Sequence, residues 1–270
     1  MKESNYEKDF LTAFDKFSYR YSKWEVWKDF LYLSAASMAN VVKTADWEER
    51  EATYLSTIKK YPKEYQELFP ELFGLVTLAL EENPEQDFLG TLYHRLHLEQ
   101  EQKGQFFTPY HICEFMSEIN FIDGSTEDGF EEKDYITVSD PACGAGAMLV
   151  AFANMVKKHN MNYQKKVLFI AQDVDQTAAL MCYIQLSLLG CSAVVIIGDS
   201  LAKPGFHPDN DVWYTPMFYM NYWRFRDFFT VGAETDCTKK TADVIVEESE
   251  IKQYVEEAGG QLMLTLENAS

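Results

Sequence analysis

A glycine-containing turn, Asp140-Pro-Ala-Cys-Gly-Ala-Gly146, stands between a predicted strand and a predicted helix. Gly144 and Gly146 let the backbone turn sharply and approach a ligand without interference from a Cβ atom. The helix beyond offers free amide groups, and the Asp140 carboxylate can bind a cationic amine or a ribose. The third glycine of a dinucleotide fingerprint is missing, which disfavours a dinucleotide-dependent oxidoreductase. The alternative is an ordinary strand-to-helix turn.

Two further carboxylates follow the next two predicted strands. Asp173 can accept hydrogen bonds from ribose hydroxyls. Asp175 is better placed to cap the following helix, which leaves Asp173 for a ligand. Asp199 can accept a hydrogen bond from an adenine amine, with Leu201 packing on the ring. The alternatives are a helix cap or a solvated residue for Asp173 and a plain turn for Asp199.

A fourth stretch, Gly104-Gln-Phe-Phe-Thr-Pro109, opens a predicted helix. Thr108 suits the N-cap and Pro109 the first helical position. A helix N-terminus also attracts a carboxylate, so this stretch can hold the α-carboxylate of an amino acid as well as start a helix. A ligand with a carboxylate, an amine, a ribose and an adenine would satisfy all four stretches. S-adenosylmethionine has these groups.

The elements that carry these residues alternate between strands and helices. Strands are predicted at Tyr135–Ser139, Val167–Ala171, Ala193–Ile197 and, more weakly, Asp211–Tyr214, with helices at Ala147 to about Lys158 and Asp175–Leu189. This alternation predicts an α/β fold with a parallel sheet and right-handed crossovers. Ligands of such sheets bind beyond the carboxyl ends of the strands, where the four stretches fall.

The first hundred residues have a helical period. An apolar stripe runs from Phe10 to Leu31, and helices are predicted at Asp46–Lys60, Gln66–Glu82 and Gln86–Gln100. In the third helix, Leu68, Leu72, Leu75 and Leu78 are expected on the core side. We therefore predict a helical domain over residues 1–103 and an α/β domain over residues 104–270.

The composition narrows the classes of function. Apolar residues make up 47% and charged residues 25% of the 270 residues, which is typical of a globular chain. The net charge of −19 does not attract DNA, so a role on nucleic acid needs a local basic groove or a basic partner. No apolar run is long enough to span a bilayer. The five cysteines lack metal-ligand spacing, so we expect no metal site and reduced thiols in a cytoplasmic protein.

The chain resembles the adenine-N6 DNA methyltransferases, especially the modification subunits of type I restriction systems. The matching stretches, in family order, are Asp87–Tyr93, Gly104–Pro109, Asp140–Gly146, Ala171–Asp175 and Gly198–Leu201. The resemblance implies a Rossmann-like methyltransferase fold that binds S-adenosylmethionine. The expected cofactor-binding residues are Phe107, Thr108, Asp140, Ala142, Gly144, Gly146, Asp173, Asp199 and Leu201.

The family's catalytic motif, Asp/Asn/Ser-Pro-Pro-Tyr/Phe after the fourth strand, is altered here. In that motif the polar side chain and a proline carbonyl accept hydrogens of the adenine amine, and the aromatic ring stacks on the flipped base. The corresponding stretch is Thr215-Pro-Met-Phe218. Thr215, Pro216 and Phe218 are the candidate catalytic residues, but a threonine hydroxyl is a weaker acceptor than a carboxylate.

The region after Phe218 has only 52 residues, so we expect a shortened sheet. Arg224 and Arg226 lie among aromatic residues and could stack on nucleic acid or form an ordinary surface. The sequence thus favours a DNA adenine methyltransferase whose target recognition comes from a partner. The partners considered are a specificity subunit and, in a homo-oligomer, a second copy of the chain. Two alternatives remain: a regulatory or assembly subunit that binds the cofactor without catalysis, and an acidic decoy of a DNA-binding enzyme.

Overall fold

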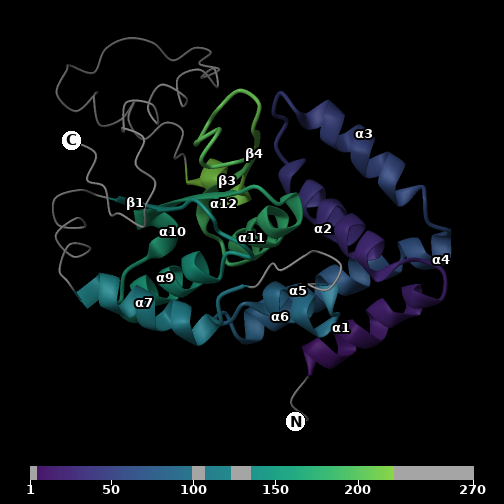
Figure 1. Ribbon diagram of the computed structural model, residues 1–270, viewed down its shortest axis with the longest axis horizontal. Coiled ribbons are helices and arrows are strands. Elements are labelled where there is room, and N and C mark those ends of the chain that lie inside the picture. The colour runs from purple at the N-terminus through teal and green to yellow at the C-terminus, as the bar shows by residue number, and fades with distance from the viewer. Residues whose placement is uncertain (1–4, 99–106, 123–134, 222–270) are drawn as a thin grey trace.

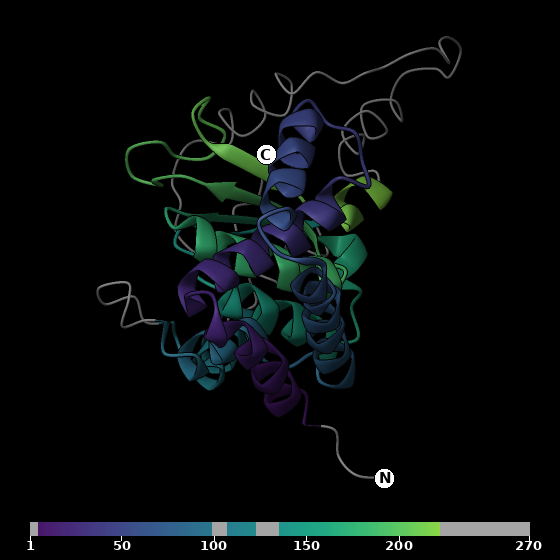
Figure 2. The same ribbon diagram turned by 90° about the vertical axis from the view of Figure 1, so that its right-hand side faces the viewer.

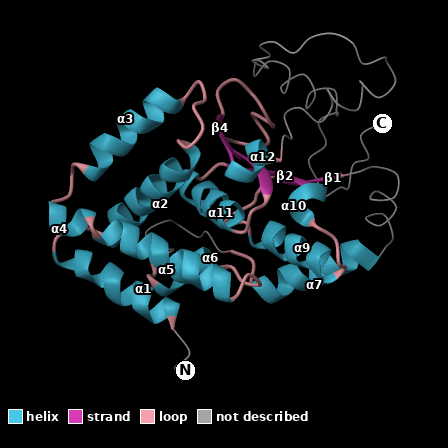
Figure 3. Cartoon of the chain, turned by 180° about the vertical axis from the view of Figure 1, so that it is seen from behind, coloured by secondary structure: helices cyan, strands magenta, loops and turns pink. Residues whose placement is uncertain are grey.

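The computed structural model describes residues 5–98, 107–122 and 135–221 (Figure 1). Three sequence predictions lie outside the described residues. They are a surface loop expected from the acidic stretch 123–134, the Arg224 and Arg226 cluster, and the apolar stretches Asp243–Val246 and Leu262–Leu266, each of which could be a strand. Helices dominate the described chain, and its strands gather in one sheet (Figure 3). None of the helices described is both long and apolar enough to cross a membrane.

The N-terminal part is helical, as predicted. Its elements are α1 (Tyr6–Asp15), a 3-10 helix (Lys16–Tyr19), α2 (Lys23–Ala39), α3 (Trp47–Ile58), α4 (Lys63–Gln66), α5 (Leu68–Glu82) and α6 (Phe88–Arg95). The prediction of a helix to Gln100 was wrong, because α6 ends at Arg95 and His97 has a φ of 61°. Leu78 was also misplaced: it is 45% exposed, whereas Leu72, Val76 and Leu80 form the buried face of α5.

The α/β part begins with α7 (Tyr110–Ile122). It continues with β1 (Ile136–Asp140), α9 (Ala147–Lys158), α10 (Tyr163–Lys166), β2 (Val167–Asp173), α11 (Gln176–Leu188), β3 (Ser192–Ile197), β4 (Asp211–Tyr214) and α12 (Pro216–Met220). The cap role predicted for Asp175 is confirmed, because its side chain accepts the amide of Thr177 at the start of α11. The outward face of α7 is apolar, with Phe115 61% exposed.

The strands form one sheet in the order β1-β2-β3-β4, which confirms the predicted α/β class. β1, β2 and β3 are parallel, and their order runs in one direction, so right-handed crossovers bring α9 and α11 to the same face. In Figure 2 the green strands lie above most of the helices. β4 differs from the other strands in its direction: it pairs antiparallel with β3, and Tyr214 lies opposite Val194.

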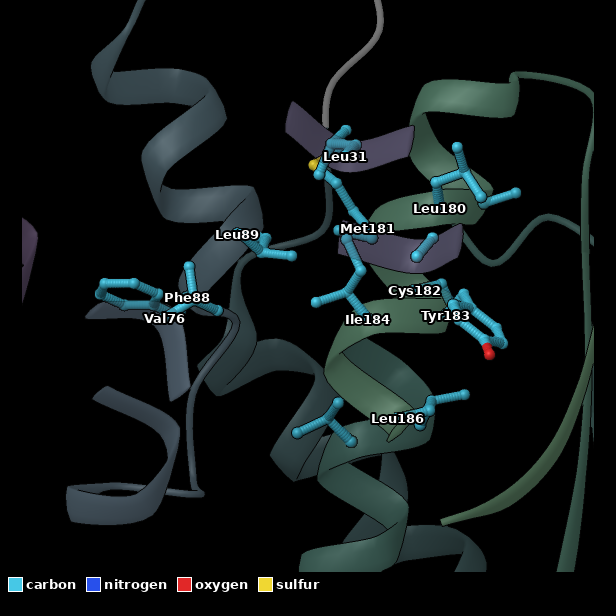
Figure 4. Packing of buried hydrophobic residues seen from close by; sticks show 14 of the residues in the cluster. Leu31, Val76, Phe88, Leu89, Leu180, Met181, Cys182, Tyr183, Ile184 and Leu186 are labelled. Carbon is cyan, nitrogen blue, oxygen red and sulfur yellow. The ribbon is translucent and has the colours of Figure 1, made fainter. Parts of the chain in front are cut away.

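Residues alternate between the two faces of the sheet, as a pleated strand requires. Val138, Phe169 and Val195 face α9 and α11, whereas Val194 and Ile196 pack with Phe218 of α12 on the other face. The first core continues without interruption into the N-terminal helices. Residues of α2, α5 and α6, among them Leu31, Val76 and Leu89, belong to the same buried cluster as the residues of α11 (Figure 4). The division at residue 103 remains a prediction.

Candidate cofactor site at the carboxyl edge of the sheet

The glycine turn joins β1 to α9 and depends on two backbone conformations that favour glycine. Gly144 has a φ of +54° and Gly146 a φ of +89°. A Cβ atom on Gly146 would lie 2.8 Å from the Cys182 sulfur, and one on Gly144 would lie 3.0 Å from the ring of Phe107. The turn is therefore packed tightly against α11 on one side and against the stretch that precedes α7 on the other.

Asp140 ends β1 at the start of this turn. One carboxylate oxygen accepts the amide of Ala142 at 3.1 Å. Burial raises the pKa of the Asp140 carboxyl above its usual value, the Ala142 amide opposes this, and the nearby negative charge of Asp173 raises it further. A cationic group beside Asp140 would lower the pKa of this carboxyl again, because it would stabilise the charged form.

Asp173 ends β2 and joins two turns. One of its oxygens accepts the amide of Gly144 at 2.8 Å, and the other accepts the amide of Asp175 at 2.9 Å. The expectation that this carboxylate is left free was therefore wrong, because both oxygens already hold the backbone. Each carboxylate oxygen can accept a second hydrogen bond, so the side chain keeps capacity for a hydroxyl donor. Burial raises the pKa of Asp173, whereas its amide partners lower it.

Asp199 lies in the loop after β3, and its side chain is exposed. One oxygen accepts the amides of Leu201 and Ala202, which lowers the pKa of this carboxyl. This is the plain-turn geometry weighed for Asp199, and it leaves the second oxygen for a ligand amine. Leu201 is 94% exposed. An apolar side chain this exposed is available to pack on a flat ring.

Sequence reasoning missed two residues at this edge. Val174 follows Asp173 and is 71% exposed, so it offers a second apolar surface after a neighbouring strand. Gln172 is 1% exposed, and its carboxamide holds the loop after β3 by donating to the carbonyls of Gly198 and Lys203 and accepting the amide of Gly205. A polar residue in an otherwise apolar strand was the available signal.

The stretch before α7 reaches the same turn through Phe107. Its ring lies over Gly144 and 5.1 Å from the ring of Tyr93, measured between centroids. Thr108 is exposed. The helix starts one residue later than predicted, because α7 begins at Tyr110 and the Pro109 carbonyl accepts the amides of Ile112 and Cys113. Pro109 thus takes the cap position, and a capping role for Thr108 was wrong.

The parallel strands bring the first three stretches to one edge. Asp140 pairs with Ala171 and Asp173 with Ile197, and backbone hydrogen bonds join Cys143 to Gln172 and Gly198 to Asp173. Phe107 adds the fourth stretch through its contact with Gly144. The four stretches that carry the predicted cofactor residues therefore meet at one edge of the sheet. Their roles toward a ligand stay predictions.

The three candidate catalytic residues lie at the opposite edge. β4 is antiparallel, so its end carries Thr215 to the start of β3. The Thr215 hydroxyl is fully buried, donates to the Cys191 carbonyl at 2.7 Å and accepts the Ala193 amide at 2.9 Å. Pro216 is the first residue of α12, and Phe218 is buried against Val194 and Ile196 on the face of the sheet that α12 covers. The candidate catalytic residues therefore do not adjoin the predicted cofactor residues.

The fold and the edge define an α/β protein with a glycine turn and carboxylates at the carboxyl ends of its parallel strands. A family model described as N-6 DNA Methylase matches residues 85–247, which is more than half of the chain. The chain belongs to the N-6 DNA methylase family.

The other two comparisons add little. The search of curated proteins gives no match. Among solved structures, the chain is similar to a Listeria monocytogenes protein named as a class I S-adenosylmethionine-dependent methyltransferase, with 14% identity, 82% of this chain and 70% of that chain covered, and a TM-score of 0.39.

Proposed function

We propose that the chain binds S-adenosylmethionine at the carboxyl edge of its sheet and serves in adenine-N6 methylation of DNA. One observation carries the proposal: the Asp173 carboxylate holds the amide of Gly144, which fixes a glycine turn between two carboxylates and an exposed apolar loop. The chemistry of these groups fits the cofactor. Family membership supports the reaction class.

Each group at the edge has a role in this proposal. Asp140 attracts the amine, and Asp173 accepts from the ribose hydroxyls. Val174 and Leu201 pack on the adenine ring, and Asp199 accepts from its amine. The bound cofactor supplies an electrophilic sulfonium methyl group. The chain's own contribution is to hold the cofactor in one orientation. A methyl group held close to its acceptor in the right geometry reacts faster than one that is free to move.

Binding is tested first, by calorimetry with purified protein. We expect a dissociation constant in the micromolar range, which corresponds to a binding free energy of about −8 kcal/mol. S-adenosylhomocysteine should also bind, because it keeps every group named above except the methyl group and its charge. Absence of heat with both compounds at millimolar concentration would reject the site.

A second function is favoured by the position of Thr215. A group that holds the amine of the target adenine in DNA has to lie next to the cofactor. Thr215 lies at the opposite edge of the sheet from the proposed cofactor site. The chain would then be a cofactor-binding subunit of a methylase or a regulatory subunit without transfer of its own. With a charge of −19, contact with DNA would come from a basic partner such as a specificity subunit.

A radiolabelled methyl-transfer assay distinguishes the two functions. The chain is tested on DNA of mixed sequence, alone and with candidate partner subunits. Transfer by the chain alone supports a complete enzyme whose adenine-binding residues lie outside residues 5–98, 107–122 and 135–221. Transfer only with a partner supports a subunit. Cofactor binding without transfer in either mixture supports the regulatory role.

A further inference from the structure

A buried polar network joins the N-terminal helices to the glycine turn. Gln185 of α11 is fully buried, and its amide group donates to the Ala145 carbonyl at 2.8 Å and to Asp87 at 2.9 Å. Its carbonyl oxygen accepts the amide of Leu89 at 3.1 Å. The same Asp87 oxygen accepts the amide of Gly90 at 2.9 Å and thereby caps α6.

The surroundings of this network are apolar. Leu89 of α6 belongs to the same buried core as Ile184 and Leu186 of α11, and all three are fully buried. Figure 4 shows Leu89 on the side of α11 that faces α6. Burying a carboxamide and a carboxylate here costs free energy unless their hydrogen bonds are made. All polar groups of the Gln185 side chain are used. A Cβ atom on Gly90 would lie 2.0 Å from Asp87, so α6 is shaped around this carboxylate.

We infer that Gln185 and Asp87 are positioning residues of the cofactor site, a role that rests on the proposed function. Ala145 stands between the two glycines with positive φ, and its carbonyl is held by Gln185. Fixing this carbonyl fixes the direction of the neighbouring peptide groups and preorganises the turn for the ligand. The N-terminal helices thus form part of the cofactor site through α6.

The test compares two glutamine-to-methionine variants. Gln185→Met keeps the length of the side chain and removes its three hydrogen bonds. The control is Gln66→Met, because the Gln66 amide also donates to two backbone carbonyls, those of Ile58 and Tyr61, far along the chain from the turn. Binding of S-adenosylmethionine is measured by calorimetry well below each melting temperature. We expect about tenfold or greater weakening for Gln185→Met and no change for Gln66→Met.

A second measurement covers the case in which Gln185→Met does not fold. Amide hydrogen exchange of the unchanged protein is followed with and without S-adenosylmethionine. We expect the cofactor to slow exchange at Leu89 and Gly90, which the network links to the turn. Unchanged exchange there, or a folded Gln185→Met protein with unchanged affinity, would overturn the positioning role. If the unchanged protein binds no cofactor at all, the proposed function itself fails.

Discussion

Gly146 shows how a single residue limits the chemistry of the turn. Its φ of +89° is unfavourable for any residue with a side chain, and the Cys182 sulfur occupies the space that a Cβ atom would need. We expect Gly146→Ala to destabilise the fold by about 1–3 kcal/mol and to weaken cofactor binding. The control is Gly74→Ala in α5, where nothing lies within 4 Å of the added Cβ. That change should stabilise the helix by up to about 1 kcal/mol. Urea denaturation measures both, and equal effects would contradict the packing argument.

The charge of Asp140 should lower the stability of the fold at neutral pH and strengthen cofactor binding. Its pKa is raised in the fold, so its contribution to stability is complete at low pH and is lost as the pH rises through the raised pKa. Asp140→Asn keeps an acceptor for the Ala142 amide without the charge. At pH 7 we therefore expect this variant to be more stable than the unchanged protein and to bind S-adenosylmethionine more weakly.

The pH dependence of binding provides an independent check. The affinity of the unchanged protein for S-adenosylmethionine should fall as the pH drops through the pKa of Asp140, which is raised above its usual value. In Asp140→Asn this dependence should be weaker. The control is Asp9→Asn, which removes one charge from an exposed position of α1. An Asp140→Asn protein with unchanged stability and affinity would mean that the carboxylate does not serve the cofactor.

At the scale of elements, the direction of β4 determines what Thr215 does. We expect Thr215→Val to cost about 1–3 kcal/mol, because the Cys191 carbonyl and the Ala193 amide lose their buried partner. Cofactor affinity should not change. The control is Thr12→Val, since the Thr12 hydroxyl donates only to an exposed carbonyl of α1 and should matter by about 0.5 kcal/mol or less. Cofactor binding that collapses in a folded Thr215→Val protein would contradict this geometry.

The elements also show what the sequence could and could not predict. The parallel strands and the glycine turn were predictable, because apolar runs and glycine spacing are local signals. The direction of β4 could not be predicted from the strand itself, because a four-residue strand reads the same in either direction. One signal was available: the loop of residues 198–210 has no helical pattern, and a parallel crossover usually needs a helix. The contact of Gln185 with Asp87 joins residues 98 positions apart and left no local signal.

For the whole molecule, Arg50 should be the strongest link between the N-terminal helices and the sheet. Its side chain is 7% exposed, donates to the Val212 carbonyl at 2.7 Å, pairs with Asp211 at 3.4 Å and lies 4.4 Å from the ring centroid of Trp213. These contacts join α3 to β4. The continuous core predicts that both parts unfold together, and this link should be part of that cooperative unit.

Arg50→Met tests this cooperativity. The variant leaves the Val212 carbonyl without a buried donor, so we expect a loss of about 2–4 kcal/mol. Circular dichroism, dominated by the helices, and tryptophan fluorescence should report one common transition at lower urea. Arg95→Met is the matched control, because Arg95 pairs with Glu7 on the surface and should contribute less than about 1 kcal/mol. Two separate transitions in the unchanged protein would instead support independent domains, and the helices could then reach the glycine turn only through a weak interface.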